Sequence, residues 1–222
     1  MTLRLHYHPF SSFCQKVLIA LYEKDLPFER NVVNLRDAEQ HAALQRLWGL
    51  AQFPVLESEE SDVSLPESSI IIEHLDRLKP GAAALVPADP EAALRVRLWD
   101  RIFDLYVEIP LQKVVGDRFR PAGASDPHGV EEAKARLATT YGIIEAGLAE
   151  EREWIAGEAF SLADCGAAPA LVYANMIVPL AGHVRLQAYF ERLIARPSVA
   201  RALDEARPFR PYFPLGWPEG YL

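Results

Sequence analysis

The chain has 222 residues, with 23 Lys and Arg against 31 Asp and Glu, and a formal net charge of −8. Half of its residues are hydrophobic and 24% are charged, which is typical of a folded globular protein and excludes a disordered chain. Nucleic-acid binding needs clustered Lys and Arg, so we expect no nucleic-acid partner. Two cysteines are too few for a secreted disulfide framework, and no export signal opens the chain, so we expect a cytoplasmic protein.

The first third of the chain alternates strand and helix patterns. Residues 2–7 alternate apolar and polar side chains, as a strand does, and residues 12–24 carry apolar side chains at helical spacing. The other elements predicted here are a strand at 27–33, a helix at 37–47, a hairpin of 53–57 with 63–65, and a helix at 67–78. This order predicts a small mixed sheet with helices on its faces.

The rest of the chain predicts helices only. Apolar residues recur at steps of three and four over 91–118, which predicts one long helix that bends at Pro110. Further helices are predicted at 130–151, 161–181, 186–195 and 197–206. The aromatic tail from Arg207 is expected to pack over a surface. We therefore predict an α/β domain at 1–79, a linker at 80–90 and an all-helical domain at 91–222.

One uncharged stretch, residues 165–182, reaches the lower limit of length for a membrane span. Pro169 and Pro179 interrupt this stretch, and Asp164 immediately precedes it. These features favour a buried central helix, and we expect no membrane partner.

Ser11 and Ser12 lie where the first strand ends and the first helix begins. A helix N-terminus presents unpaired N–H groups and a partial positive charge, which favour an anion such as a thiolate. A hydroxyl placed there adds a charge-assisted hydrogen bond to that anion. The alternative interpretation is that both serines merely cap the helix.

Three further segments carry candidate chemistry. Pro54 opens a strand, and if its peptide bond is cis the backbone of Val55 is exposed to an extended ligand. Glu67 and Ser68 open a helix and suit the ammonium and carboxylate of an amino-acid head group, although Pro66 and serine are also ordinary helix-start signals. Ser161-Leu-Ala-Asp164 is a capping box, for which we expect a structural role.

Taken together, these segments resemble the cytosolic glutathione S-transferase family nearly from end to end. Residues 11–21 look like the first-helix motif of the zeta-type members, and the Ser-x-x-Cys spacing is similar to the omega type. The resemblance implies a thioredoxin-like first domain followed by an all-helical domain. It also implies a homodimer and glutathione as co-substrate in detoxification, without a metal; the six histidines show no ligand spacing either.

The resemblance assigns roles to individual residues. It implies that Ser11 donates a hydrogen bond to the glutathione thiolate, and that Phe53-Pro54-Val55 is the family's cis-proline segment, which pairs with the cysteinyl backbone. Glu67 and Ser68 would bind the γ-glutamyl group, and Gln40 or His41 the glycyl carboxylate. The expected glutathione contacts are Phe13, Gln40, His41, Phe53, Pro54, Val55, Glu67 and Ser68. The expected walls of an apolar electrophile pocket are Phe10, Leu105, Tyr106 and Ile109.

Two other functions remain open from the sequence. Cys14 lies about one turn into the first helix and could act as the nucleophile of a glutathione-dependent thiol-disulfide oxidoreductase, although a buried helix cysteine is the simpler interpretation. A binding or scaffold protein could keep the fold and glutathione without turnover. We expect Cys165 to lie in the core.

Overall fold

The computed structural model describes residues 2–58, 61–80, 84–149 and 152–222. Four strands form one mixed sheet in the order β2-β1-β3-β4. β1 (Leu3–Tyr7) runs parallel to β2 (Glu29–Val32) and antiparallel to β3 (Val55–Ser58), which pairs with β4 (Ser61–Pro66). Three helices accompany the sheet, α1 (Ser12–Glu23), α2 (Ala38–Leu47) and α3 (Ser68–Leu78).

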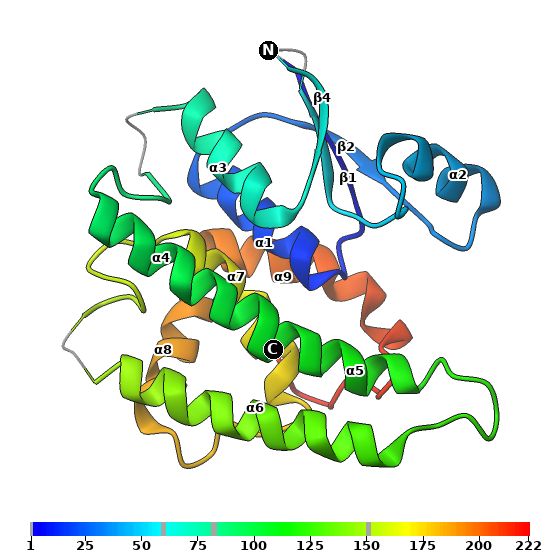
Figure 1. Cartoon of the computed structure of the whole chain (residues 1–222), viewed down its shortest axis with the longest axis vertical. Helices are drawn as coiled ribbons and strands as arrows, with labels where there is room; N and C mark the ends of the chain where they lie inside the picture. Colours follow the sequence, from blue (N-terminus) through cyan, green and yellow to red (C-terminus); the bar gives the residue numbers. More distant parts are fainter. Residues whose placement is uncertain (1, 59–60, 81–83, 150–151) are drawn as a thin grey trace.

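The chain then continues as helices below this sheet (Figure 1). They are α4 (Pro90–Ile102), a π-helical segment (Phe103–Glu108), α5 (Ile109–Asp117), α6 (Pro127–Gly147), α7 (Leu162–Asn175), α8 (Val184–Ala195), α9 (Pro197–Ala206) and a 3-10 turn (Arg207–Tyr212). The predicted fold class, a thioredoxin-like unit followed by an all-helical unit, is confirmed.

Among the helix ends that differ from the sequence prediction, two have a clear local cause. α6 begins three residues earlier than predicted, because Asp126 accepts a hydrogen bond from the Gly129 N–H at 2.9 Å and Pro127 fits a first turn. α7 stops at Asn175, well before the predicted end at residue 181. The Asn175 side chain accepts from the Leu180 N–H at 2.9 Å and so holds the chain in a turn after the helix.

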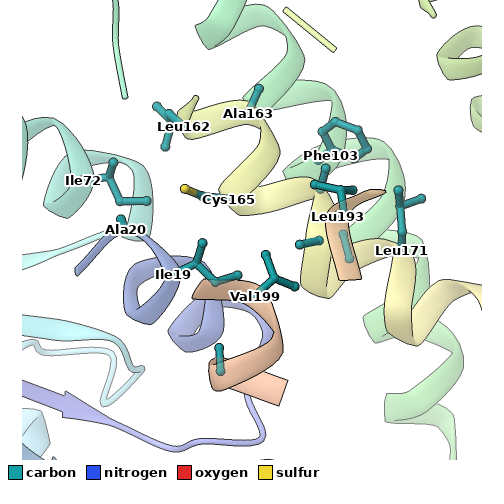
Figure 2. Packing of buried hydrophobic residues seen from close by; sticks show 14 of the residues in the cluster. Ile19, Ala20, Ile72, Phe103, Leu162, Ala163, Cys165, Leu171, Leu193 and Val199 are labelled. Carbon is teal, nitrogen blue, oxygen red and sulfur yellow. The ribbon is translucent and has the colours of Figure 1, made fainter. Parts of the chain in front are cut away.

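Helix α1 joins the two units, because it packs against α3 on one side and against α7 and α9 on the other. Figure 2 shows side chains from three of these helices converging, with Ile19 from α1, Cys165 from α7 and Val199 from α9. All three side chains are at most 1% exposed. One hydrophobic core therefore includes residues of both units. The domain boundaries predicted between residues 79 and 91 stay a prediction.

The long helix predicted over 91–118 turns a different face inward from the one its apolar spacing indicated. Leu94, Leu98 and Tyr106 are 63%, 55% and 46% exposed, whereas Asp100, Asp104 and Glu108 are buried. The π segment precedes Pro110, whose ring would clash with the carbonyl four residues earlier in a regular helix. The extra residue in that turn accommodates the proline, at the place where a bend was predicted.

The buried carboxylates of this helix face a lysine on α1. Lys16 Nζ lies 2.6 Å from Asp100 Oδ1 and 2.9 Å from Asp104 Oδ1, and Ser69 Oγ donates to Asp100 at 2.7 Å. A buried charge needs such partners, because an unpaired one is strongly destabilising. Asp100 and Asp104 are therefore buried opposite Lys16, on a face that also carries the buried Val96, Phe103 and Val107.

The capping box at the start of α7 has the predicted structural role. Asp164 accepts from the Ser161 N–H at 2.8 Å and from the Ser161 hydroxyl at 2.7 Å. Tyr189 on α8 donates to the same carboxylate at 2.5 Å. The box thus ties α7 to α8 inside the core.

The aromatic tail packs against the helices, as predicted. Phe213 is only 7% exposed, and Tyr221 donates from its hydroxyl to the Val172 carbonyl at 2.7 Å. The apolar stretch from residue 165 forms the buried helix α7, and among the described residues no helix is both long and apolar enough to cross a membrane.

Candidate functional site

The turn between β1 and α1 places Ser11 at the N-cap of α1. Its backbone is extended and its N–H donates to the His8 carbonyl at 3.0 Å, but its hydroxyl makes no capping bond to the helix. The Ser12 hydroxyl instead donates to Glu108 at 2.9 Å. The interpretation that both serines merely cap the helix is therefore wrong.

Both serines line a large cavity of about 860 Å³ between the two units. Phe10 lies in its wall, as the sequence prediction expected. The other walls come from β2, the π segment, α5 and the residues just after it, α7 and the tail. They include Leu111, Val115, Phe119, Tyr173, Phe209, Tyr212 and Phe213. The cavity is thus largely aromatic and aliphatic, which suits an apolar ligand.

Leu105, Tyr106 and Ile109 do not line this large cavity. Leu105 and Ile109 lie in the wall of a smaller pocket, and Tyr106 lines neither of the two. The reason is the inverted face of the long helix described above. The prediction that these three residues line the electrophile pocket is therefore corrected. Residues of α5 and the tail form the apolar wall of the large cavity instead.

The smaller pocket, of about 260 Å³, gathers the residues predicted to bind an amino-acid head group. Glu67 and Ser68 lie here together with Phe13 and Pro54. Glu67 has a φ of 69°, an uncommon conformation for a residue other than glycine, at the turn that opens α3. Arg101 adds a positive charge and Asp104 a negative one to the same pocket.

The Phe53–Pro54 peptide is cis. Phe53 lines both the large cavity and the smaller pocket, so the two spaces adjoin at this residue. Val55, in contrast, is fully buried, is paired with His6 on one side and Pro66 on the other, and lines neither space. The expectation that the Val55 backbone is open to an extended ligand is therefore corrected. Phe53, and not Val55, faces both spaces.

Gln40 and His41 were equal candidates for the glycyl carboxylate, and the structure separates them. Gln40 lines the large cavity, and its side-chain oxygen accepts from the Asn34 N–H at 2.8 Å. His41 lines neither that cavity nor the smaller pocket. Arg36 also lines the cavity, as the only Lys or Arg among the described residues that do so.

Cys14 is fully buried, and burial raises the pKa of its thiol to about 12, although hydrogen bonds to Ser11 and to the His8 backbone act in the opposite direction. A thiol with so high a pKa carries almost no thiolate at neutral pH and is a poor nucleophile. The geometry therefore disfavours the redox alternative. Cys165 lies in the core, as expected.

The cavity residues that the sequence analysis did not predict include His8 and Glu108, whose pKa values the structure shifts. His8 is half-buried between Phe53 and Phe209, and burial lowers its pKa. Glu108 is 3% exposed, and burial raises the pKa of its carboxyl to about 8. No pattern in the sequence marks Glu108, because the apolar spacing assigned it to the solvent face.

The fold and the site define a class of protein. It has a thioredoxin-like unit joined to a helical unit, with two adjoining pockets where the units meet. Comparison with known proteins identifies the family. The family models "Glutathione S-transferase, N-terminal domain" and "Glutathione S-transferase, C-terminal domain" match residues 5–83 and 127–192. The chain belongs to the cytosolic glutathione S-transferase family. The prediction that it is a glutathione S-transferase is confirmed.

Individual relatives are distant but are matched over nearly their whole length. A glutathione S-transferase of Pseudomonas putida is 28% identical over 95% of this chain and 96% of its own. FtsZ-localized protein A of Caulobacter vibrioides is 27% identical over 96% of this chain and 92% of its own. A solved glutathione S-transferase from Methylobacillus flagellatus with glutathione bound superposes with a TM-score of 0.81 at 26% identity, over 90% of this chain and 98% of its own.

Proposed function

We propose that this protein is a glutathione transferase that activates the glutathione thiolate for attack on an apolar electrophile. The observation that carries the proposal is a pair of adjoining pockets that share Phe53 in their walls, one polar and one apolar, with Ser11 in the wall of the larger. The γ-glutamyl group lies at Glu67 and Ser68, and the tripeptide extends along Phe53. Its glycyl carboxylate meets Gln40 and Arg36.

Ser11 is the hydrogen-bond donor to the sulfur in this proposal. Its hydroxyl makes no capping bond, and the N-terminus of α1 adds a partial positive charge. A free cysteine thiol has a pKa of about 8.5. Lowering that pKa by about two units corresponds to about 2.7 kcal/mol of thiolate stabilisation. The sulfur then attacks an electrophile in the large cavity.

The test is a pH titration of the thiolate absorbance of bound glutathione. We expect bound glutathione to titrate well below free glutathione, and Ser11→Ala to remove most of this shift. Ser12→Ala is the matched control, because the Ser12 hydroxyl is directed to Glu108. Bound glutathione that titrates like the free tripeptide, or a shift that survives in Ser11→Ala, would contradict the role of Ser11.

We also propose the homodimer implied by the family resemblance. Leu94 and Leu98 on α4 and Ile70 on α3 are each more than half exposed, and Arg97 ties the two helices together through Glu73 at 2.8 Å. A second copy would cover this apolar face. Leu98→Glu should lower the molar mass measured by light scattering, whereas Leu50→Glu, at a residue 66% exposed, should not.

A second candidate is a non-catalytic binding protein. It is supported by the relative named FtsZ-localized protein A, whose name records a location and not a reaction. Glutathione binding without turnover of any electrophile would favour this candidate. The cytoplasmic location and the absence of a metal, nucleic-acid or membrane partner stay predictions under either function.

A further inference from the structure

The carboxyl group of Glu108 has an unusual position in the wall of the large cavity. It lies at the end of the π segment and is 3% exposed. Its Oε2 accepts from the Ser12 hydroxyl at 2.9 Å, next to the proposed sulfur position at Ser11. Its Oε1 is buried and has no hydrogen-bond partner among the described residues. Buried polar groups are usually hydrogen-bonded, so an unsatisfied carboxyl oxygen in a cavity wall points to a bound water, a ligand or a catalytic role.

The surroundings of Glu108 favour its neutral, protonated form. Lys16 is a cation that favours the charged form of Glu108, but Asp100 and Asp104 already bind that ammonium group. Asp104 repels a charge on Glu108, and the nearby Tyr173 is neutral because burial raises the pKa of its hydroxyl. Burial is the largest cause that raises the pKa of Glu108 to about 8, and the Ser12 hydrogen bond opposes it.

We propose that Glu108 is the catalytic acid of this site, which donates a proton to the electrophile as the glutathione sulfur attacks it. This inference rests on the proposed transferase function and narrows its substrate class. The protein would take acceptors whose reaction must end in a proton transfer, above all α,β-unsaturated carbonyl compounds. Aryl halides, which release a halide ion, need no such acid.

The addition conserves protons and electrons. The thiol loses its proton to water when the thiolate forms beside Ser11. The sulfur lone pair forms a bond to the β-carbon, and the carbon–carbon π electrons move onto the α-carbon and the carbonyl oxygen. The Glu108 O–H bond breaks, its proton passes to that enolate, and the carboxylate regains a proton from water.

The experiment compares two probes, benzylideneacetone as the unsaturated ketone and chlorodinitrobenzene as the aryl halide. General acid catalysis contributes on the order of 100-fold, so Glu108→Gln should lower kcat/KM for the ketone by about 100-fold. The loss of rate with the aryl halide should be much smaller than the loss with the ketone. Glu191→Gln, an exposed position on α8, is the matched control.

The pH profile adds a readout that a merely structural role would not move. The wild-type rate with the ketone should fall as pH rises through about 8, where Glu108 ionises. Ser12→Ala should move that fall to higher pH, since the Ser12 hydrogen bond stabilises the carboxylate. Glu108→Gln should show no such fall.

Four results would overturn the inference. One is an equal loss with both probes in Glu108→Gln, which would indicate a structural role. Another is an unchanged rate with the ketone. The third is wild-type protein that reacts with the aryl halide alone, which would leave the transferase function standing. Wild-type protein that reacts with neither probe would overturn both the inference and the transferase function.

Discussion

The substitution Glu108→Gln should change how the stability of the protein depends on pH. An ordinary glutamate pKa is 4.5, and burial raises that of Glu108 to about 8. Between these two values the folded state binds more protons at this site than the unfolded state does. The free energy of unfolding of the wild type therefore falls as pH rises through this window, and the contribution of Glu108 is fully favourable only below it.

The size of the effect follows from the two pKa values. Their difference corresponds to roughly 5 kcal/mol above pH 8, which is an upper bound because a charged side chain attracts water and relaxes its surroundings. Glutamine keeps the shape of the protonated carboxyl and an oxygen that can accept from Ser12. We therefore expect the two proteins to be about equally stable near pH 5 and Glu108→Gln to be more stable by about 2–5 kcal/mol near pH 9.

The assay is denaturant unfolding of both proteins from pH 5 to 9 at one protein concentration, since the stability of the proposed dimer would depend on that concentration. Other titrating groups are common to both proteins and cancel in the difference between the two curves. Glu191→Gln is the control, because its exposed side chain should not change the slope. Parallel curves for wild type and Glu108→Gln would refute the reasoning, since Glu108 would then titrate alike in the folded and unfolded states.

Three further predictions concern burial and packing. Cys14 and Cys165 are 0% exposed, so neither should react with a thiol reagent until the protein is unfolded; fast labelling of the native protein would contradict their burial. Gly142→Ala should raise the free energy of unfolding by about 1 kcal/mol because its Cβ meets open space, whereas Gly147→Ala on the same helix should lower it because its Cβ would meet an indole ring; equal effects would contradict this packing. Asp164→Ala should cost about 3–5 kcal/mol in thermal or denaturant unfolding, because it leaves buried donors without an acceptor, and a loss below about 1 kcal/mol would contradict this role.

Local sequence patterns were sufficient for the fold class and for several parts of the site. Strand alternation and helical spacing are properties of neighbouring residues, so they predicted the order of strands and helices up to α3. The capping box of Ser161 and Asp164 is also a local motif and was found as predicted. The pairing of Glu67 and Ser68 with Pro54 in one pocket followed from the family resemblance, and the structure brings these three residues together.

Only the tertiary structure decided which face of the long helix is buried. Apolar spacing turned Leu105 and Ile109 toward the core, but the buried ammonium of Lys16 on α1 requires carboxylates opposite it. Lys16 and Asp104 are 88 residues apart, so no local pattern could reveal this pairing. The same inversion brings Glu108 to Ser12, across 96 residues, and into the wall of the cavity.

The chemical state of single groups also depends on contacts distant in sequence. A cysteine one turn into a helix can be a low-pKa nucleophile or an inert core residue, and the complete burial of Cys14 decides for the second. Gln40 and His41 are neighbours in sequence, and only the direction of α2 relative to the cavity separates them. The sequence by itself thus determined the fold and the family, whereas burial and long-range pairing, which are set by packing, determined which side chains can perform chemistry.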